Sequence, residues 1–150
     1  MRRQNDILEM HKSRCAERQK IIISEEKRSK HTARNKDNQL VRHYLIDGDV
    51  IVNKDVDKCD YLILNDEKKT AYFIELKGSK MQHAIKQLKN TEEMLKTNLQ
   101  EYTVYYRVVF SGNATHGVNN SLFLKWQKQC GMKNGVLVVQ RGRSEFKEEI

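Results

Sequence analysis

The sequence predicts an α/β fold with a central mixed β-sheet flanked by helices, and three observations support it. Two runs rich in β-branched and aromatic residues, 59–64 and 71–78, flank a polar turn, which is typical of an antiparallel β-hairpin. A similar run, 102–110, follows a segment whose apolar residues recur at helical spacing. Because a strand–helix–strand connection joins parallel strands, the sheet should contain both strand orientations.

Residues 1–38 are predicted to form a basic helical segment. This stretch contains no proline or glycine, and its apolar residues are few. Ser24 is a possible helix start, because Glu25 and Glu26 behind it would lie at the positive end of the helix dipole. Ile22 and its neighbours would then pack on the sheet. A chain of 150 residues fits a single domain, 1–150, and can bury roughly two thirds of its unfolded surface.

Residues 43–52 are expected to form one strand, or two short strands kinked at Gly48. Asp47 and Asp49 share a face if the strand is regular, which makes them candidate metal ligands. Acids beside a strand glycine more often hold a turn or bulge, so that interpretation is the favoured one. A charged connection, 53–58, leads to the hairpin.

Three charged residues lie where the hairpin should be buried. Because side chains alternate along a strand, Glu75 and Lys77 share one face, and antiparallel pairing brings Asp60 beside Glu75. Two buried carboxylates repel each other, which favours a hard divalent cation between them. The alternative is a solvent-facing ion pair between Glu75 and Lys77, but the apolar flanks of both residues are typical of a central strand.

The second half of the chain should alternate helices and strands. The predicted elements are an amphipathic helix capped by Ser79 and running to about Leu99, a strand over 102–110, a short helix over 121–130 stopped at Gly131, and a strand over 135–140. Trp126 is expected to be a packing anchor. The charged residues 145–150 are expected to fray.

The formal net charge is +8, and the basic residues are concentrated near the start of the chain. Such a distribution favours contact with phosphate backbones, because cationic side chains displace condensed counterions from a polyanion. The alternative is a solvated helix face. No run approaches the roughly 20 apolar residues of a membrane span, and the three cysteines form no C-x-x-C pair. We therefore expect a cytoplasmic protein with reduced thiols and no zinc site.

Asp60 followed by Glu75-Leu76-Lys77 resembles the Asp…(Asp/Glu)-x-Lys signature of the PD-(D/E)XK nuclease superfamily, which includes restriction enzymes and Holliday-junction resolvases. Gln87 in the following helix matches a glutamine that several branches carry. Cys59 stands where the signature has its proline. The resemblance covers nearly the whole chain and implies an α-β-β-β-α-β core.

The resemblance also implies a site and an activity. Asp60, Glu75 and the Leu76 carbonyl would hold Mg²⁺ or Mn²⁺, Lys77 would position the attacking water, and Gln87 would assist. Glu25 or Glu26 would supply an acid from the first helix. The expected protein is a DNA endonuclease, possible as a homodimer because two strands need two active sites.

Two other classes of function are open. One is a non-catalytic nucleic-acid-binding or assembly module that retains the nuclease fold and binds DNA without metal-dependent turnover. The other is a regulator that uses the basic N-terminal segment as a partner helix. The presence of Asp60, Glu75 and Lys77 together favours the enzyme.

Overall fold

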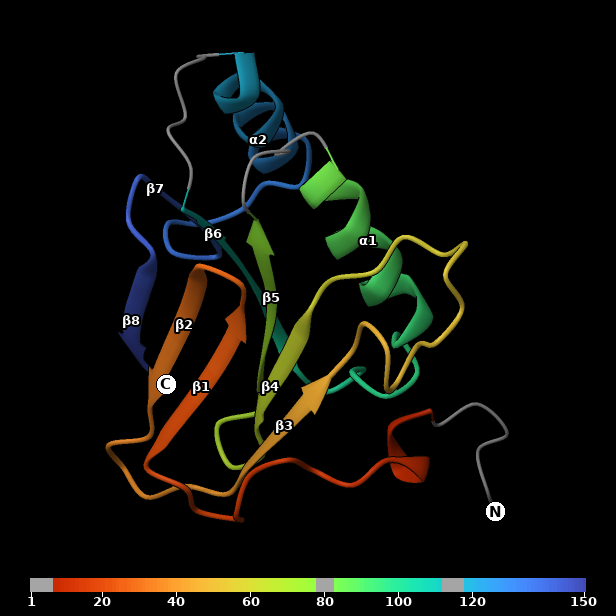
Figure 1. Ribbon diagram of the computed structural model, residues 1–150, viewed down its shortest axis with the longest axis vertical. Helices are drawn as coiled ribbons and strands as arrows, with labels where there is room; N and C mark the ends of the chain where they lie inside the picture. Colours follow the sequence, from red (N-terminus) through yellow and green to blue (C-terminus); the bar gives the residue numbers. More distant parts are fainter. Residues whose placement is uncertain (1–6, 78–82, 112–117) are drawn as a thin grey trace.

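The computed structural model describes residues 7–77, 83–111 and 118–150, and places them in two sheets and two helices (Figure 1). The elements are a short 3-10 helix Leu8–Met10, β1 Ile21–Glu26, β2 Ser29–Arg34, β3 Val41–Leu45, β4 Tyr61–Asn65, β5 Thr70–Lys77, α1 Ala84–Met94, β6 Thr103–Phe110, α2 Val118–Gln129, β7 Leu137–Arg141 and β8 Glu145–Glu149. The α/β class is confirmed.

The larger sheet has five strands in the order β3-β4-β5-β6-β7. The first three strands pair antiparallel, and β5, β6 and β7 pair parallel through helical crossovers. The sheet is therefore mixed, as predicted, and the hairpin of β4 and β5 lies at its centre. Strand β5 has a neighbour on each side, which explains why its run of six residues from Ala71 to Leu76 is buried throughout.

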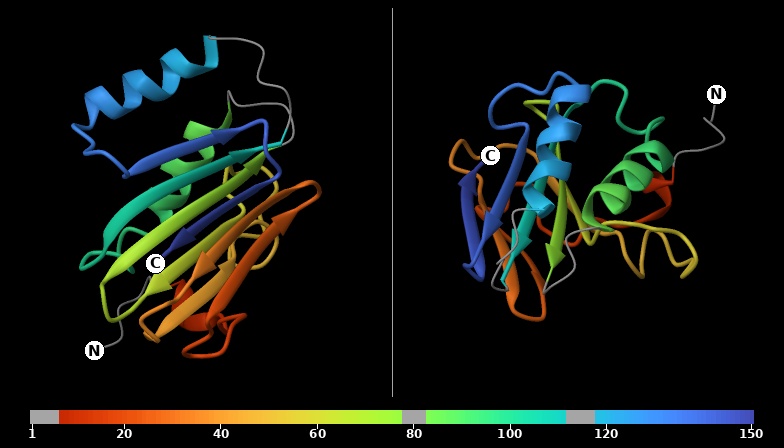
Figure 2. Two further views of the ribbon diagram at one scale, coloured as in Figure 1. Left: turned by 90° about the vertical axis from the view of Figure 1, so that its left-hand side faces the viewer. Right: turned by 90° about the horizontal axis from the view of Figure 1, so that it is seen from above.

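The two faces of this sheet are covered differently from the prediction. Both α1 and α2 lie on one face, and the opposite face packs against a second sheet of three strands in the order β1-β2-β8 (Figure 2). Leu62, Phe73 and Leu88 belong to the core on the helical side. Ile22, Ile63 and Ile74 belong to the core between the sheets. The result is three layers, one of helices and two of strands.

The predicted N-terminal helical segment is wrong. Residues 21–34 form the antiparallel hairpin of β1 and β2, in which Ile22 pairs with Ala33 and Glu26 with Ser29. The inward positions of the hairpin include Ser24, Ser29 and His31, all buried. Because these inward residues are polar, the alternation that marks a half-buried strand is hidden in the sequence.

The expectation that residues 145–150 fray is also wrong. They contain β8, which pairs parallel to β2, and Ile150 is buried between the two sheets. Glu148 on β8 contacts His31 and Arg107, with Glu148–His31 at 2.6 Å and Glu148–Arg107 at 2.8 Å. These partners come from β2 and β6, so local sequence gives no sign of them.

Other boundaries shift modestly. Helix α1 ends at Met94 rather than near Leu99, and the proposed cap Ser79 lies outside the described residues. Trp126 is buried against Tyr106, as expected of a packing anchor. Strand β3 ends at Leu45, and Gly48, with φ of +102°, makes the turn that follows it. No helix among the described residues is both long and apolar enough to cross a membrane.

Candidate active site at the end of the central hairpin

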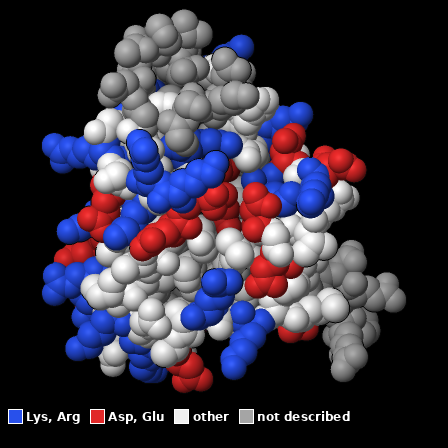
Figure 3. Space-filling model, in the orientation of Figure 1, with Lys and Arg blue, Asp and Glu red and all other residues white. Residues whose placement is uncertain are grey.

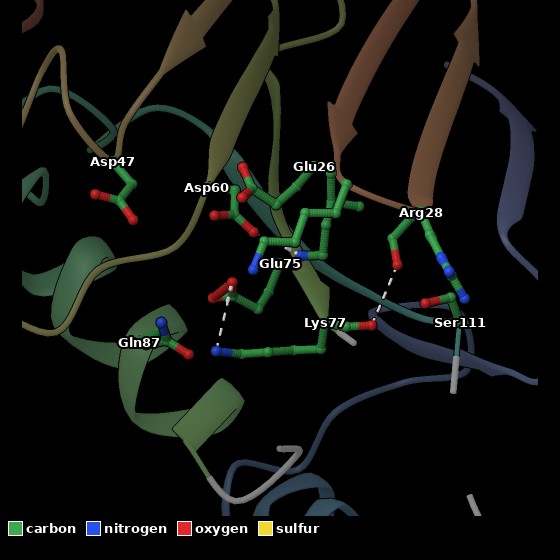
Figure 4. Close-up of a pocket in the computed structure, with 11 residues that line it drawn as sticks. Glu26, Arg28, Asp47, Asp60, Glu75, Lys77, Gln87 and Ser111 are labelled. Carbon is green, nitrogen blue, oxygen red and sulfur yellow. Dashed lines mark hydrogen bonds and ion pairs between the residues drawn. The ribbon is translucent and has the colours of Figure 1, made fainter. Parts of the chain in front are cut away.

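A cavity of about 390 Å³ lies where β4 begins and β5 ends, between the start of α1 and the β1–β2 turn (Figure 4). Its walls combine acidic, basic and hydroxyl side chains. The lining residues of the cavity are Glu26, Lys27, Arg28, Ser29, Asp47, Asp60, Glu75, Leu76, Lys77, Gln87 and Ser111. The structure thus gathers in one place the four side chains that the sequence analysis named as catalytic.

Asp60 and Glu75 face each other across the hairpin. Asp60 precedes Tyr61 and Glu75 follows Ile74, and Tyr61 and Ile74 are paired in the hairpin. The two carboxylates therefore lie at the end of the hairpin that is far from its turn. Leu62, Leu64 and Phe73 pack on the helical side of the sheet. By strand alternation, Asp60 and Glu75 point to that same side, as predicted.

The two carboxylates differ in their support. Asp60 Oδ2 accepts a hydrogen bond of 2.7 Å from the Leu76 amide, and Asp60 is 7% exposed. Glu75 is 1% exposed, and its Oε2 has no hydrogen-bond partner among the described residues. A buried carboxylate oxygen without a donor is costly, so this atom marks a place where a ligand would stabilise the fold.

Burial raises the pKa of Glu75 well above its ordinary value, and the charge of Asp60 raises it further. Burial also raises the pKa of Asp60, although contacts with Glu75, the Leu76 amide and Lys77 oppose the rise. Repulsion between the two groups favours a single proton shared by the pair and held on Glu75. A cation in the cavity would remove the need for that proton.

Lys77 and Gln87 approach the pair from two elements. Lys77 Nζ lies 4.0 Å from Glu75 Oε1, and its side chain is 19% exposed. Gln87 projects from α1 toward the same space, and its Oε1 is buried without a hydrogen-bond partner in the described part of the chain (Figure 4). Both sequence-predicted residues therefore reach the cavity. Leu76 lines it as well, while the use of its carbonyl as a ligand stays a prediction.

The two candidates for an additional acid, Glu25 and Glu26, lie in different surroundings. Glu26 lines the cavity, and burial together with the nearby Asp60 raises its pKa. Glu25, on the outer face of β1, instead pairs with Lys30 at 3.6 Å and is not part of the cavity wall. Both residues belong to a strand and not to the predicted helix. Of the two candidates, only Glu26, an exposed residue at the end of β1, therefore reaches the cavity wall.

The two acids near Gly48, Asp47 and Asp49, also lie in different surroundings. Asp47 lines the cavity and lies 3.6 Å from the Nζ of Lys58, a buried lysine held by the carbonyls of Asn53 and Val56. Asp49 contacts His11 at 3.2 Å, away from the cavity wall. Asp47 is therefore a possible outer member of the site, and Asp49 is not.

Four lining residues were missed by sequence reasoning. Lys27, Arg28 and Ser29 form the turn of the β1–β2 hairpin and the start of β2, and Ser111 follows β6. Ser29 Oγ donates to the Lys77 carbonyl at 3.1 Å, and the Ser111 amide donates to the same oxygen at 3.2 Å. The polar, glycine-free sequence around Lys27 carries no turn signal, so only the tertiary structure shows these contacts.

The donor set of the cavity suits a hard divalent cation. Its acidic side chains offer only oxygen, which Mg²⁺ and Mn²⁺ prefer, and Glu75 Oε2 is buried and unpaired. Among the described residues, no three His, Cys, Asp or Glu side chains lie close enough together to hold a metal ion by themselves. A cation there would need the Asp60–Glu75 pair completed by backbone oxygen, water or substrate.

Comparison with known protein families, with curated proteins and with solved structures finds no match to this chain.

Proposed function

We propose that this protein is a metal-dependent nuclease that hydrolyses phosphodiester bonds, with DNA as its substrate and internal cleavage as its mode of action. The observation that carries the proposal is the buried pair Asp60 and Glu75, which lines a cavity together with Lys77. Two buried carboxylates side by side destabilise a protein core. Their position on the wall of a cavity therefore favours a catalytic role over a purely structural one.

The acidic residues of the cavity would hold the cation. Asp60 and Glu75, with the Leu76 carbonyl, would hold Mg²⁺ or Mn²⁺, and Glu26 on the cavity wall would act on the cation through a water molecule rather than as a direct ligand. When bound, the cation supplies charge neutralisation at the scissile phosphate and a lower pKa for water. Asp60 is held in orientation by the Leu76 amide.

Lys77 and Gln87 would act on the reactants. The ammonium of Lys77 lies beside Glu75, where it would hold a water molecule or a phosphate oxygen in line for attack. The free amide oxygen of Gln87 would accept a hydrogen bond from the same water, because it is buried and has no other described partner. In both roles the side chain positions the attacking water or the phosphate and does not itself react.

The test is cleavage of supercoiled plasmid, linear duplex, single strands, RNA and a four-way junction in Mg²⁺, Mn²⁺ or EDTA. Wild-type protein should nick or linearise DNA only with the cation, and Glu75→Gln and Asp60→Asn should lose at least about 100-fold in rate. Asp55→Asn, an exposed acid outside the cavity, is the matched control and should cleave like wild type. Cleavage by Glu75→Gln at the wild-type rate would remove the assignment, and binding without cleavage would point to the DNA-binding module instead.

A further inference from the structure

The turn of the β1–β2 hairpin places two cationic residues on the wall of the acidic cavity. Strands β1 and β2 stay in register up to Glu26 and Ser29, so Lys27 and Arg28 alone form the turn. Both line the cavity, and Arg28 lies on the side opposite Gln87 in the close-up view (Figure 4). In the space-filling view, a band of Lys and Arg side chains lies directly above a group of acidic side chains on this face (Figure 3).

This turn is fixed to the rest of the site. Ser29, directly after it, donates to the carbonyl of Lys77 at 3.1 Å. On the other strand, the hydroxyl of Tyr61 donates to the carbonyl of Glu25 at 2.9 Å. The hairpin tip is thus tied to β5 and β4, the two strands that carry Glu75 and Asp60. Its cations have a defined position relative to the carboxylate pair.

Neither cation of the turn forms an ion pair within the described ranges, whereas Lys30, Lys58 and Lys77 each form one. The charge of Lys27 does act on the carboxylate of its neighbour Glu26. Lys27 also has a φ of +51°, a left-handed conformation that glycine or asparagine adopts more readily. Lys69, in the turn between β4 and β5, has a similar φ of +55°, so the conformation of Lys27 belongs to the hairpin turn. What distinguishes Lys27 and Arg28 is that these two exposed cations line the acidic cavity.

We propose that Lys27 and Arg28 bind phosphate groups of the DNA strand that flank the scissile phosphate, so that the hairpin tip holds the strand while the cavity cleaves it. This inference deepens the proposed function and rests on it. A phosphate at the rim and another at the carboxylate pair require at least two linked phosphates. The substrate class is therefore a polynucleotide, and a small phosphodiester with one phosphate would not use the grip.

The first experiment measures binding without cleavage. Full-length Glu75→Gln protein, with and without Lys27→Ala or Arg28→Ala, is titrated with a fluorescein-labelled 20-base-pair duplex in EDTA over a range of salt. Each alanine variant should weaken binding by about tenfold at low salt and reduce the slope of log K against log [salt] by about 0.9. Lys20→Ala, an exposed cation at the other end of the same hairpin, is the matched control and should change neither value.

The second experiment measures turnover with intact catalytic residues. Arg28→Ala should raise KM for duplex DNA about tenfold with kcat within about threefold, whereas Lys20→Ala should change neither value. Equal effects of Arg28→Ala and Lys20→Ala on duplex binding would overturn the grip, whatever the activity of the protein. Conversely, the alanine variants could lose DNA binding in a protein that shows no cleavage at all. That result would support phosphate binding by Lys27 and Arg28 and contradict the proposed nuclease activity, so the two failures are distinguishable. Arg28→Lys, which keeps the charge, should restore most of the binding.

Discussion

Asp60 accepts a hydrogen bond from the Leu76 amide, whereas Glu75, on the facing strand, keeps one buried oxygen without a hydrogen-bond partner among the described residues. The two carboxylates are therefore unequal, and Glu75 is the one whose negative charge the fold supports least. Burial raises the pKa of Glu75 well above its ordinary value, with Asp60 adding to the rise. Several measurable properties depend on this imbalance.

Glu75→Gln should stabilise the cation-free protein at neutral pH. The folded pKa of Glu75 is raised, so its stabilising contribution is complete below the unfolded value of 4.5 and is lost as pH rises through the folded value. Glutamine keeps the shape of the protonated acid and cannot ionise. In EDTA at pH 7 we expect a gain of about 1–2 kcal/mol in the free energy of unfolding, measured by urea denaturation.

The same comparison at pH 4.5 should show a smaller gain, because Glu75 is then protonated in the folded state and about half protonated in the unfolded state. Asp55→Asn, at an exposed acid outside the cavity, serves as the control. A wild-type and Glu75→Gln pair that differs equally at both pH values would contradict the raised pKa.

Divalent cations should stabilise the wild-type protein through the carboxylate pair. A ligand that binds only the folded state at ten times its Kd adds about 1.4 kcal/mol. We therefore expect Mn²⁺ to raise the Tm of wild type and of Asp55→Asn, but not that of Glu75→Gln or Asp60→Asn, in scanning calorimetry. Equal shifts in all four proteins would mean that the cation binds elsewhere.

Glu148→Gln should destabilise the protein strongly, in contrast to Glu75→Gln. Burial alone would raise the pKa of Glu148, but its hydrogen bonds with His31 and Arg107 outweigh burial and lower it. The charge therefore stabilises the fold above the unfolded value of 4.5, and that contribution is lost as pH falls through the folded value. Removing the charge leaves Arg107 buried without its partner, at a cost of about 3 kcal/mol.

Glu149→Gln, one residue further along β8, is the matched control for Glu148→Gln. Its carboxylate is half exposed and lies 3.2 Å from Lys36. The loss in urea denaturation should stay below about 1 kcal/mol. Similar losses in the two variants would show that the buried contact contributes little.

Ile150→Ala should lower stability by about 2–4 kcal/mol, because Ile150 is 2% exposed in the core between the two sheets. Val52→Ala, at a position 70% exposed, should change stability by less than about 0.5 kcal/mol. Urea denaturation of both variants measures the difference. A cost below 1 kcal/mol at Ile150 would indicate that the second core does not depend on this residue.

The centre of the fold and most of the candidate site followed from local patterns. The hairpin of β4 and β5 was predictable because its apolar runs are long and Asp60, Glu75 and Lys77 interrupt them at positions that strand alternation brings together. Gln87 was named from the family resemblance, because the helical spacing of its neighbours does not single it out. Local spacing suffices where neighbouring elements are also neighbours in the chain.

The three-stranded sheet could not be predicted, for a physical reason. Its buried positions hold Ser24 and His31, which look like surface residues until their partners His43 and Glu148 are known. Those partners lie far away in the sequence, and a polar residue becomes acceptable in a core only when paired. Lys27 and Arg28 were missed with the hairpin that carries them.

The pairing of β2 with β8 joins an early and a late segment of the sequence in one sheet. The five-stranded sheet uses strands that follow one another along the chain, whereas His31 and Glu148 are 117 residues apart. The hairpin that carries Glu26, Lys27 and Arg28 is thus held along one edge by β8 and at its tip by the contacts with Lys77 and Tyr61. A displacement of β8 would therefore be transmitted through β2 to the wall of the cavity.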